Sequence, residues 1–365
     1  MDVRIMSKTN NALNIGLITG GGDCPGLNNA IAGLIKASLP DNRVIGFYRS
    51  WNGLIENQFI PMDASMIDEI SHQGGTILKS AKSFPLNSQD KLDNITKTIK
   101  EHALDVLVII GGDSTLYVAK QIHEKLGIPI MGIPKTIDND IPHNDFSIGF
   151  VSAVETVCQS IEQVKTSAKS HSRAMVIEVM GRHTGHLTAY AGLASNCDII
   201  LVPEHPVRLD QLKQNILKRF EGQKKYLLIA VAEGAILLDE NDKPIQIFEQ
   251  DESFKGMSAK GGIRYGGIAD YISDWMNDFV DWDARSLVLG HLQRGGAASA
   301  MDRILAFSLA AKAAELIKQK QFNQILGFKQ GNIIHTSFDE VFADNQEQQK
   351  TLPEEFYQLC ILNTD

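Results

Sequence analysis

The sequence predicts an α/β protein with two lobes, each built on a parallel sheet that helices cover on both faces. Continuous apolar runs recur along the chain, and such runs are typical of parallel strands that are buried on both faces. Segments with the apolar spacing of an amphipathic helix follow most of these runs, which is the alternation that produces α/β folds. A length of 365 residues favours two domains over one ordinary core.

The first lobe is predicted over residues 1–149, where helical faces follow the first two strands. Its strands are the apolar runs LNIGLIT (13–19), LDVLVII (104–110) and IPIMGI (128–133). The second lobe is predicted over residues 150–292 and begins with a long helical face. Its strands are AMVIEVM (174–180), DIILVP (198–203), YLLIAVA (226–232) and SLVLG (286–290). A further helix is predicted over residues 304–317.

Composition excludes several classes of protein. A formal net charge of −9 lacks the basic footprint of a nucleic-acid binder. The four cysteines have neither metal-ligand nor disulfide-like spacing, which fits a reducing cytosol. The N-terminus lacks the apolar core of a signal peptide, and no apolar run approaches the ~20 residues of a membrane helix. We therefore expect a cytoplasmic protein that binds neither nucleic acid nor membrane.

Two strand ends of the first lobe carry glycine-rich turns. The turn GGGDCPGLN (20–28) places glycines between a strand and a helix, where open parallel sheets bind ligands and where helix N-termini suit phosphate. The alternative is a tight turn with a structural Asp23. In GGDST (111–115), Asp113 follows two glycines. This acid either holds Mg²⁺ or caps the following helix.

A third turn, PKTIDND (134–140), carries Asp138 and Asp140 two residues apart. On an extended segment the two side chains would point the same way. One would then act as a general base while the other positions metal or water. Alone, the stretch favours a polar loop. Three acid-bearing turns after successive strands favour phosphoryl transfer instead, because neighbouring strands would gather them in one crevice.

Two later turns carry cations. MGRHTGH (180–186) places Arg182 in a glycine-flanked turn, where an arginine suits bidentate contact with phosphate. His183 and His186 lack a third ligand nearby, which favours polar turn histidines over a metal site. GHLQRGG (290–296) pairs His291 with Arg294 at another strand end, and its glycines favour an anion site over an ordinary polar surface.

With these five segments and VAEG (231–234) in order, the sequence resembles the phosphofructokinase family from about residue 14 to about residue 320. GGGDCPGLN and VAEG resemble its mixed-substrate branch, which contains ATP and pyrophosphate users. The resemblance implies two Rossmann-like three-layer α/β/α lobes with parallel-rich sheets and the active site between them. The donor lobe would comprise residues 1–149 plus about 293–345, the fructose 6-phosphate lobe residues 150–292, and a C-terminal tail residues 346–365.

The implied reaction is Mg²⁺-dependent phosphoryl transfer to the 1-hydroxyl of fructose 6-phosphate, the glycolytic step that gives fructose 1,6-bisphosphate. Asp138 matches the family's catalytic base. Thr136 and Asp140 match its neighbours at the transferred group. Arg182 matches the arginine that stabilises this group, and Asp113 matches the acid associated with Mg²⁺.

The resemblance also assigns binding roles. The donor-binding positions are Gly21, Lys82, Gly112, Ser114, Thr115 and Lys135. The substrate-binding positions are Thr136, Asp138, Met180, Gly181, Arg182, Glu233, His291 and Arg294. Arg173 and Arg285 match arginines that reach this pocket from a neighbouring subunit, which implies a homotetramer or a homodimer.

The donor depends on two positions. The residue after GGD is glycine in ATP users and aspartate in pyrophosphate users, whereas here it is Ser114. A small uncharged side chain does not repel an α-phosphate, which favours ATP. Lys135 is typical of pyrophosphate users, although some ATP users carry it. A pyrophosphate-dependent fructose 6-phosphate 1-phosphotransferase is therefore the alternative.

Two further classes of protein have less support from the sequence. Lipid and NAD kinases share a turn like GGDST, but MGRHTGH and GHLQRGG argue against them. A non-catalytic regulatory subunit of the same fold would be expected to lack the base, and Asp138 is present.

Overall fold

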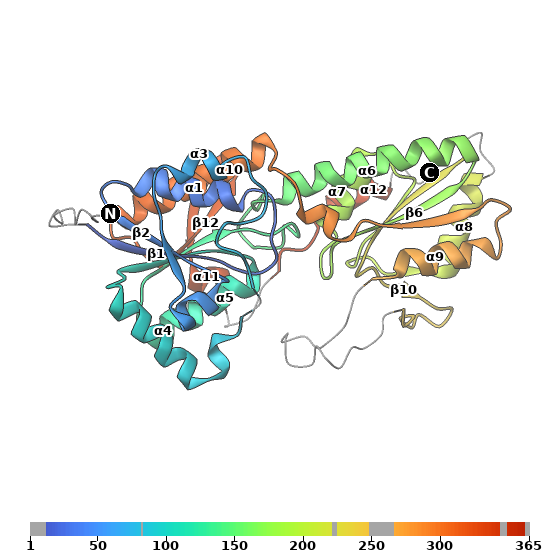
Figure 1. The fold of residues 1–365 in the computed structure, drawn as a ribbon. Coiled ribbons are helices and arrows are strands. Elements are labelled where there is room, and N and C mark those ends of the chain that lie inside the picture. The colour runs from blue at the N-terminus through green and yellow to red at the C-terminus, as the bar shows by residue number, and fades with distance from the viewer. Residues whose placement is uncertain (1–11, 82, 221–224, 248–265, 344–348, 362–365) are drawn as a thin grey trace. The chain divides into compact units, whose positions relative to one another are not determined.

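A computed structural model describes residues 12–81, 83–220, 225–247, 266–343 and 349–361. The chain divides into two compact units (Figure 1). Unit 1 contains Met1–Ser152 and Arg294–Gln349, and unit 2 contains Ala153–Gln293 and Lys350–Asp365. Among the described residues, no helix is both long enough and apolar enough to cross a membrane.

Unit 1 is built on a seven-stranded sheet of order β13-β12-β5-β4-β1-β2-β3. Its five central strands are parallel, and β3 and β13 pair antiparallel at the two edges. Strands β1, β4 and β5 are buried along their whole length, as expected for a sheet that is covered on both faces. The strands are β1 (Asn14–Thr19), β2 (Arg43–Phe47), β3 (Phe59–Pro61), β4 (Val106–Gly111), β5 (Ile130–Pro134), β12 (Gln324–Lys329) and β13 (Asn332–Ser337).

Helices cover both faces of this sheet (Figure 1). One face carries α1 (Leu27–Ser38), α3 (Met66–Ile70) and α10 (Ala300–Lys318). The other carries α2 (Trp51–Glu56), the 3₁₀ turn η1 (Pro85–Asn87), α4 (Gln89–Glu101), α5 (Asp113–Leu126) and α11 (Phe338–Val341). Helices α1 and α10 approach closely at Gly33, where a Cβ atom would lie 3.0 Å from the Ala310 Cβ. The glycine therefore allows a late segment of the chain to pack on the first helix.

Unit 2 is built on a four-stranded parallel sheet of order β11-β6-β9-β7, with a separate two-stranded pair, β8 and β10. The strands are β6 (Ala174–Val179), β7 (Ile199–Leu201), β8 (Val207–Arg208), β9 (Leu227–Ala232), β10 (Leu237–Leu238) and β11 (Ala284–Val288). The last strand begins and ends two residues earlier than the predicted 286–290, because Gly290 already starts a 3₁₀ helix, η3 (Gly290–Arg294).

In the described part of unit 2, five helices accompany the sheet. They are α6 (Phe150–His171), α7 (His186–Ala194), α8 (Leu209–Phe220), α9 (Ile268–Asn277) and α12 (Glu354–Ile361). Figure 1 shows α8 and α9 on one face and α6, α7 and α12 on the other. Helices α8 and α9 pack against the strands through one apolar cluster, which includes Leu212, Ile216, Ile268 and Ile272. These two helices therefore cover one face of the sheet.

Candidate active site

Three turns lie side by side at the carboxyl ends of β1, β4 and β5, which are adjacent in the sheet of unit 1. The backbone N–H of Gly20 donates to the Ile110 carbonyl at 2.9 Å, and that of Lys135 donates to the Gly111 carbonyl at 2.9 Å. Because β1 lies between β2 and β4, the strand order reverses here, and open sheets bind ligands at such a point. The predicted convergence of the three turns is confirmed by these contacts.

Glycines allow the three turns to approach one another. A Cβ atom on Gly20 would lie 2.5 Å from Thr115 Cγ2. Gly21 has a φ of +78°, and a Cβ atom there would lie 3.3 Å from Thr115 Oγ1 and 3.4 Å from Lys135 Nζ. On Gly112, a Cβ atom would lie 3.8 Å from the Cβ of Thr136, in the third turn. The structure therefore brings most of the predicted donor-binding residues together.

Lys135 provides a positive charge that contacts the backbone of the first turn. Its side chain is buried, with 2% of the residue exposed, and its ammonium donates to the Gly22 carbonyl at 2.5 Å. Burial lowers the pKa of this ammonium, and the carboxylates of Asp138 and Asp23 oppose that effect. A cation in this place supports an anion above the first turn, because surrounding water screens its charge little.

A pocket of about 380 Å³ opens beside the first turn. It is lined by Gly21, Gly22, Asp23, Gly75, Thr76, Lys79, Ser80 and Ala81. The Ser80 hydroxyl donates to the Gly21 carbonyl, which attaches the 75–81 segment to the glycine turn. The pocket thus has backbone groups, hydroxyls and a lysine on its walls, which suits a phosphate chain. Lys82, also predicted for the donor, lies outside the described residues.

Arg294 contacts the same glycine turn. Its Nη1 donates to the Asp23 carbonyl at 3.2 Å, and a Cβ atom on Gly22 would lie 2.4 Å from that nitrogen. Gly22 therefore leaves room for the guanidinium. Arg294 was predicted from the family resemblance to bind the sugar phosphate, and in the structure it contacts the glycine turn of unit 1.

The PKTIDND segment bends at Asn139, which has a φ of +54°. Its Nδ2 donates to the Asp145 carbonyl at 2.9 Å, and its Oδ1 accepts from the Ser147 N–H at 3.0 Å. The segment is therefore not extended, so Asp138 and Asp140 do not have the same-side placement that an extended segment would give them. The contacts of Asn139 instead form the local turns of a polar loop. Asp138 is half-buried and Asp140 is buried.

Asp113 is the first residue of helix α5, and Gly112 is its N-cap. An acid in the first turn is favoured by the helix dipole, so a structural role for Asp113 remains compatible with the structure. Ser114 follows and is exposed. The described residues contain no cluster of three histidine, cysteine or acidic side chains that could hold a metal. Asp113 nevertheless fits Mg²⁺, which is usually held by one or two carboxylates together with substrate phosphates.

A second group of predicted residues lies at the carboxyl ends of β6 and β9 in unit 2. The Gly234 N–H donates to the Gly181 carbonyl at 3.0 Å. Arg182 Nε lies 3.5 Å from Glu233 Oε1. Gly181 has a φ of +145°, a conformation that favours glycine. The structure therefore brings Met180, Gly181, Arg182 and Glu233 together.

Gln293 joins the GHLQRGG motif to this group. This fully buried side chain accepts from the Met180 N–H at 3.1 Å and donates to the Gly290 carbonyl at 2.9 Å. His291, two residues before Gln293 in η3, is exposed. Gln293 was not among the predicted site residues, although its position inside the GHLQRGG motif was the available signal.

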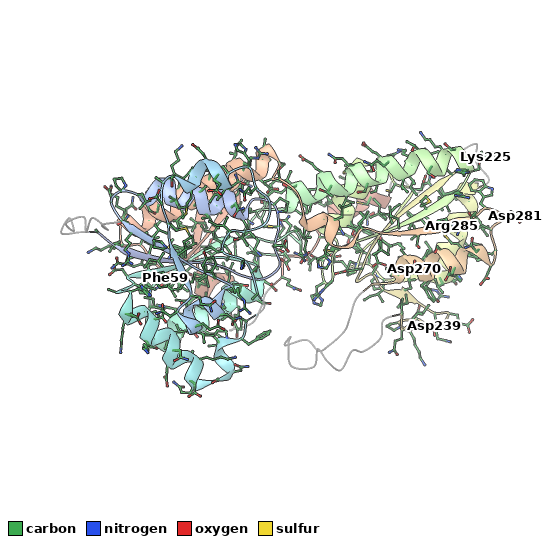
Figure 2. All side chains as sticks on the ribbon, in the orientation of Figure 1. Phe59, Lys225, Asp239, Asp270, Asp281 and Arg285 are labelled. Carbon is green, nitrogen blue, oxygen red and sulfur yellow. The ribbon has the colours of Figure 1, made fainter. Side chains whose placement is uncertain are left out.

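Arg173 and Arg285 lie at the other end of the same sheet. Arg173 precedes β6, and Arg285 is the second residue of β11, near the surface of unit 2 (Figure 2). Both guanidinium Nε atoms contact Asp283 Oδ2, at 3.0 and 2.9 Å. Within one chain, these arginines are therefore separated from Met180 and Gly181 by the length of a strand.

A model of the family described as phosphofructokinase matches residues 14–317. The chain belongs to the phosphofructokinase family. It is 36% identical over 324 residues to the pyrophosphate--fructose 6-phosphate 1-phosphotransferase of Dictyoglomus thermophilum, covering 88% of this chain and 91% of the relative. It is 35% identical to ATP-dependent 6-phosphofructokinase 3 of Streptomyces coelicolor, covering 94% of this chain and 98% of that one.

Solved phosphofructokinases share the fold. The structure of phosphofructokinase from Saccharomyces cerevisiae matches 96% of this chain with a TM-score of 0.79 and 25% identity, and the match covers 48% of the yeast chain. A pyrophosphate-dependent phosphofructokinase from Marinobacter aquaeolei has a TM-score of 0.77 at 20% identity, covering 96% and 91% of the two chains. The protein is thus a phosphotransferase of this family with its two-lobe α/β fold, and its relatives carry both donor names.

Proposed function

We propose that this phosphofructokinase transfers a phosphoryl group from ATP to the 1-hydroxyl of fructose 6-phosphate. The observation that carries the proposal is the convergence of the turns after β1, β4 and β5. Together they supply a glycine cradle, the buried cation of Lys135, and the acids Asp113 and Asp138. Phosphoryl transfer needs these parts, because its catalysis consists largely of positioning and electrostatic stabilisation.

Asp138 is the proposed general base. Its carboxylate accepts the proton of the sugar 1-hydroxyl as that oxygen attacks the phosphorus. The Asp138 N–H donates to Thr136 Oγ1 at 3.1 Å, which holds the two proposed catalytic residues in one turn. Asp140 follows on the buried side of the loop. Arg182 supplies a cation to the transferring group, and its contact with Glu233 orients the guanidinium.

Asp113 is the proposed protein ligand for Mg²⁺. Bound with the donor, this ion would neutralise charge on the phosphate oxygens. The position of Asp113 directly after Gly112 supports the assignment, because Gly112 lies beside Thr136. One carboxylate of unit 1 can then contact a metal close to the proposed base.

ATP is the proposed donor because Ser114 is small, uncharged and exposed. Pyrophosphate is the second candidate, and the specific observation in its favour is Lys135. An ammonium buried under Gly22 can hold the terminal phosphate of either donor without any contact to a nucleoside.

A homo-oligomer is also proposed, as a tetramer or a dimer. Arg173 and Arg285 lie at the amino ends of β6 and β11, whereas the proposed sugar-phosphate residues Met180 and Gly181 follow the carboxyl end of β6. Asp283 holds the two guanidinium groups as a pair. This arrangement supports a role for both arginines in the pocket of a neighbouring copy.

Parallel steady-state assays of the purified chain with fructose 6-phosphate test the proposal. ATP and pyrophosphate are supplied in turn to the wild type, Ser114→Gly and Ser114→Asp. We expect turnover with ATP that rises in Ser114→Gly, and a shift toward pyrophosphate in Ser114→Asp. Turnover with pyrophosphate alone refutes the ATP assignment, and no turnover with either donor refutes the proposed reaction.

A further inference from the structure

Glu204 joins the MGRHTGH turn to the C-terminal end of the chain. Both oxygens of its carboxylate accept from the Gly185 N–H, at 3.0 and 2.9 Å. Its Oε1 also accepts from the Leu352 N–H at 3.0 Å. One carboxylate therefore bridges two backbone amides that are far apart in the sequence, and hydrogen bonds to an ionised acceptor are among the stronger ones in proteins.

The next residue of the turn makes a second connection. His186 Nε2 donates to the Lys350 carbonyl at 3.1 Å, and 1% of this residue is exposed. Gly185 and His186 thus contact backbone groups two residues apart in the 350–352 segment, one through Glu204 and one directly. The N-terminus of α7 is attached to the C-terminal segment at both points.

Aromatic stacking fixes the C-terminal segment on unit 2. The Phe356 ring stacks on Tyr190 of α7 with centroids 4.4 Å apart and an interplanar angle of 14°. Tyr357 stacks on His205, with centroids 3.6 Å apart and planes 3° apart. His205 also lies 3.3 Å from Glu354 Oε2. Helix α12 therefore packs on Tyr190, which precedes Glu204 in the sequence, and on His205, which follows it directly.

We propose that residues 350–361, the C-terminal strap, fix the 180–185 turn for sugar-phosphate binding, with Glu204 as the positioning residue that connects the two. The proposal rests on the proposed function, which assigns Met180, Gly181 and Arg182 to the substrate. The first two residues of this turn are held by Gln293, which accepts from the Met180 N–H, and by Gly234, which donates to the Gly181 carbonyl. The last residue of the turn, Gly185, precedes α7 and is held by Glu204, which also contacts Leu352 of the strap.

Three full-length variants test the strap. Glu204→Gln keeps the shape of the side chain and removes its charge. Phe356→Ala loosens the strap from Tyr190 without a change in the turn. We expect Glu204→Gln to raise KM for fructose 6-phosphate about tenfold, the size of one hydrogen bond to a charged acceptor, and Phe356→Ala to raise the same KM. Because the turn also carries Arg182, kcat should fall in both variants, whereas the donor KM should stay unchanged. Glu355→Gln, at an exposed position of the same helix, is the control with matched charge and should keep all three constants.

The double variant separates positioning from general destabilisation. If both residues act through one connection, Glu204→Gln combined with Phe356→Ala should raise KM less than the product of the single effects, since residues in one network are not additive. A merely structural role would lower thermal stability and the yield of active enzyme while the KM of the folded fraction stays at its wild-type value.

Hydrogen exchange on the wild type provides a test that does not depend on how the variants fold. Fructose 6-phosphate should slow amide exchange in peptides from residues 180–186 and 350–361 together. Unchanged exchange in the strap, or an unchanged KM in folded variants, overturns the proposal. A wild type without activity on fructose 6-phosphate refutes the proposed function, whereas an active wild type whose variants keep its KM refutes the strap alone.

Discussion

Acidification from about pH 7.5 to about pH 5 is expected to destabilise the protein through one buried histidine, His186. Its Nε2 donates to the Lys350 carbonyl, so the neutral ring carries its proton on that atom. The other nitrogen, Nδ1, is buried and has no hydrogen-bond partner among the described residues. A second proton would therefore place a charged, unsatisfied donor in the interior, which costs free energy.

The size of this loss of stability follows from the pKa of the His186 ring. Burial lowers the pKa of the His186 imidazole from 6.5 to about 4, the positive charge of Lys350 acts in the same direction, and the hydrogen bond to the Lys350 carbonyl opposes both. Between these two values the unfolded chain binds a proton that the folded chain does not, so the free energy of unfolding falls as the pH falls. The loss is ~2 kcal/mol at about pH 5 and approaches ~3 kcal/mol below about pH 4.

Urea unfolding of the wild type and of His186→Gln, at both pH values, measures this loss. Glutamine keeps an N–H donor for the Lys350 carbonyl but does not titrate. Most other ionisable groups contribute equally to both chains, so the wild type should lose ~2 kcal/mol more than the variant on acidification. An identical pH dependence of the two chains, or a His186 NMR titration with a midpoint near 6.5, would refute the reasoning.

Three further outcomes are expected from single positions. Gly234→Ala should lower kcat/KM for fructose 6-phosphate by about 10²-fold, because its Cβ would lie 2.1 Å from the Arg182 carbonyl oxygen; steady-state kinetics with full activity would contradict this. Cys24, whose thiol pKa is raised to about 12 chiefly by burial, should resist iodoacetamide in the native protein and react after denaturation, as followed by mass spectrometry. Asp302→Ala should lower the free energy of unfolding by about 3 kcal/mol, because Asp302 accepts from two backbone N–H groups and a hydroxyl in the interior; an unchanged unfolding midpoint would exclude that role.

Strands β1, β4 and β5 of unit 1 and the four strands of the parallel sheet in unit 2 could be predicted from sequence because burial on two faces makes them largely apolar. The parallel strands β2 and β12 were not predicted. Strand pairs at the edge of the sheet give no such signal. The hairpin of β12 and β13 turns at Gln330 and Gly331, which have φ values of +50° and +82°. Two positive φ values identify a primed two-residue turn, but Gln-Gly lacks the Asn-Gly signature of that turn. The hairpin was therefore absent from the sequence analysis.

Long-range contacts explain what sequence reasoning could not find in the candidate site. The Glu204 contact with Leu352 spans 148 residues, and the Arg294 contact with Asp23 spans 271. No local pattern encodes such distances. In contrast, the turns after β1, β4 and β5 could be placed together from sequence, because neighbouring parallel strands bring their carboxyl ends to one edge. The PKTIDND segment does not place Asp138 and Asp140 as an extended strand would, because Asn139 adopts a left-handed conformation.

The net charge of −9 opposes the binding of any phosphorylated ligand, so local cations have to outweigh the global field. Lys135 reaches the carbonyl of Gly22 from below the glycine turn, and Arg294 reaches the carbonyl of Asp23 from the other end of the chain. Each of these cations has N–H groups besides the one that contacts the carbonyl. Lys135 and Arg294 can therefore also donate to a phosphate oxygen. The return of the chain to unit 1 at Arg294 therefore adds a further positive charge to those that Lys135 and Lys79 supply at the proposed donor turn.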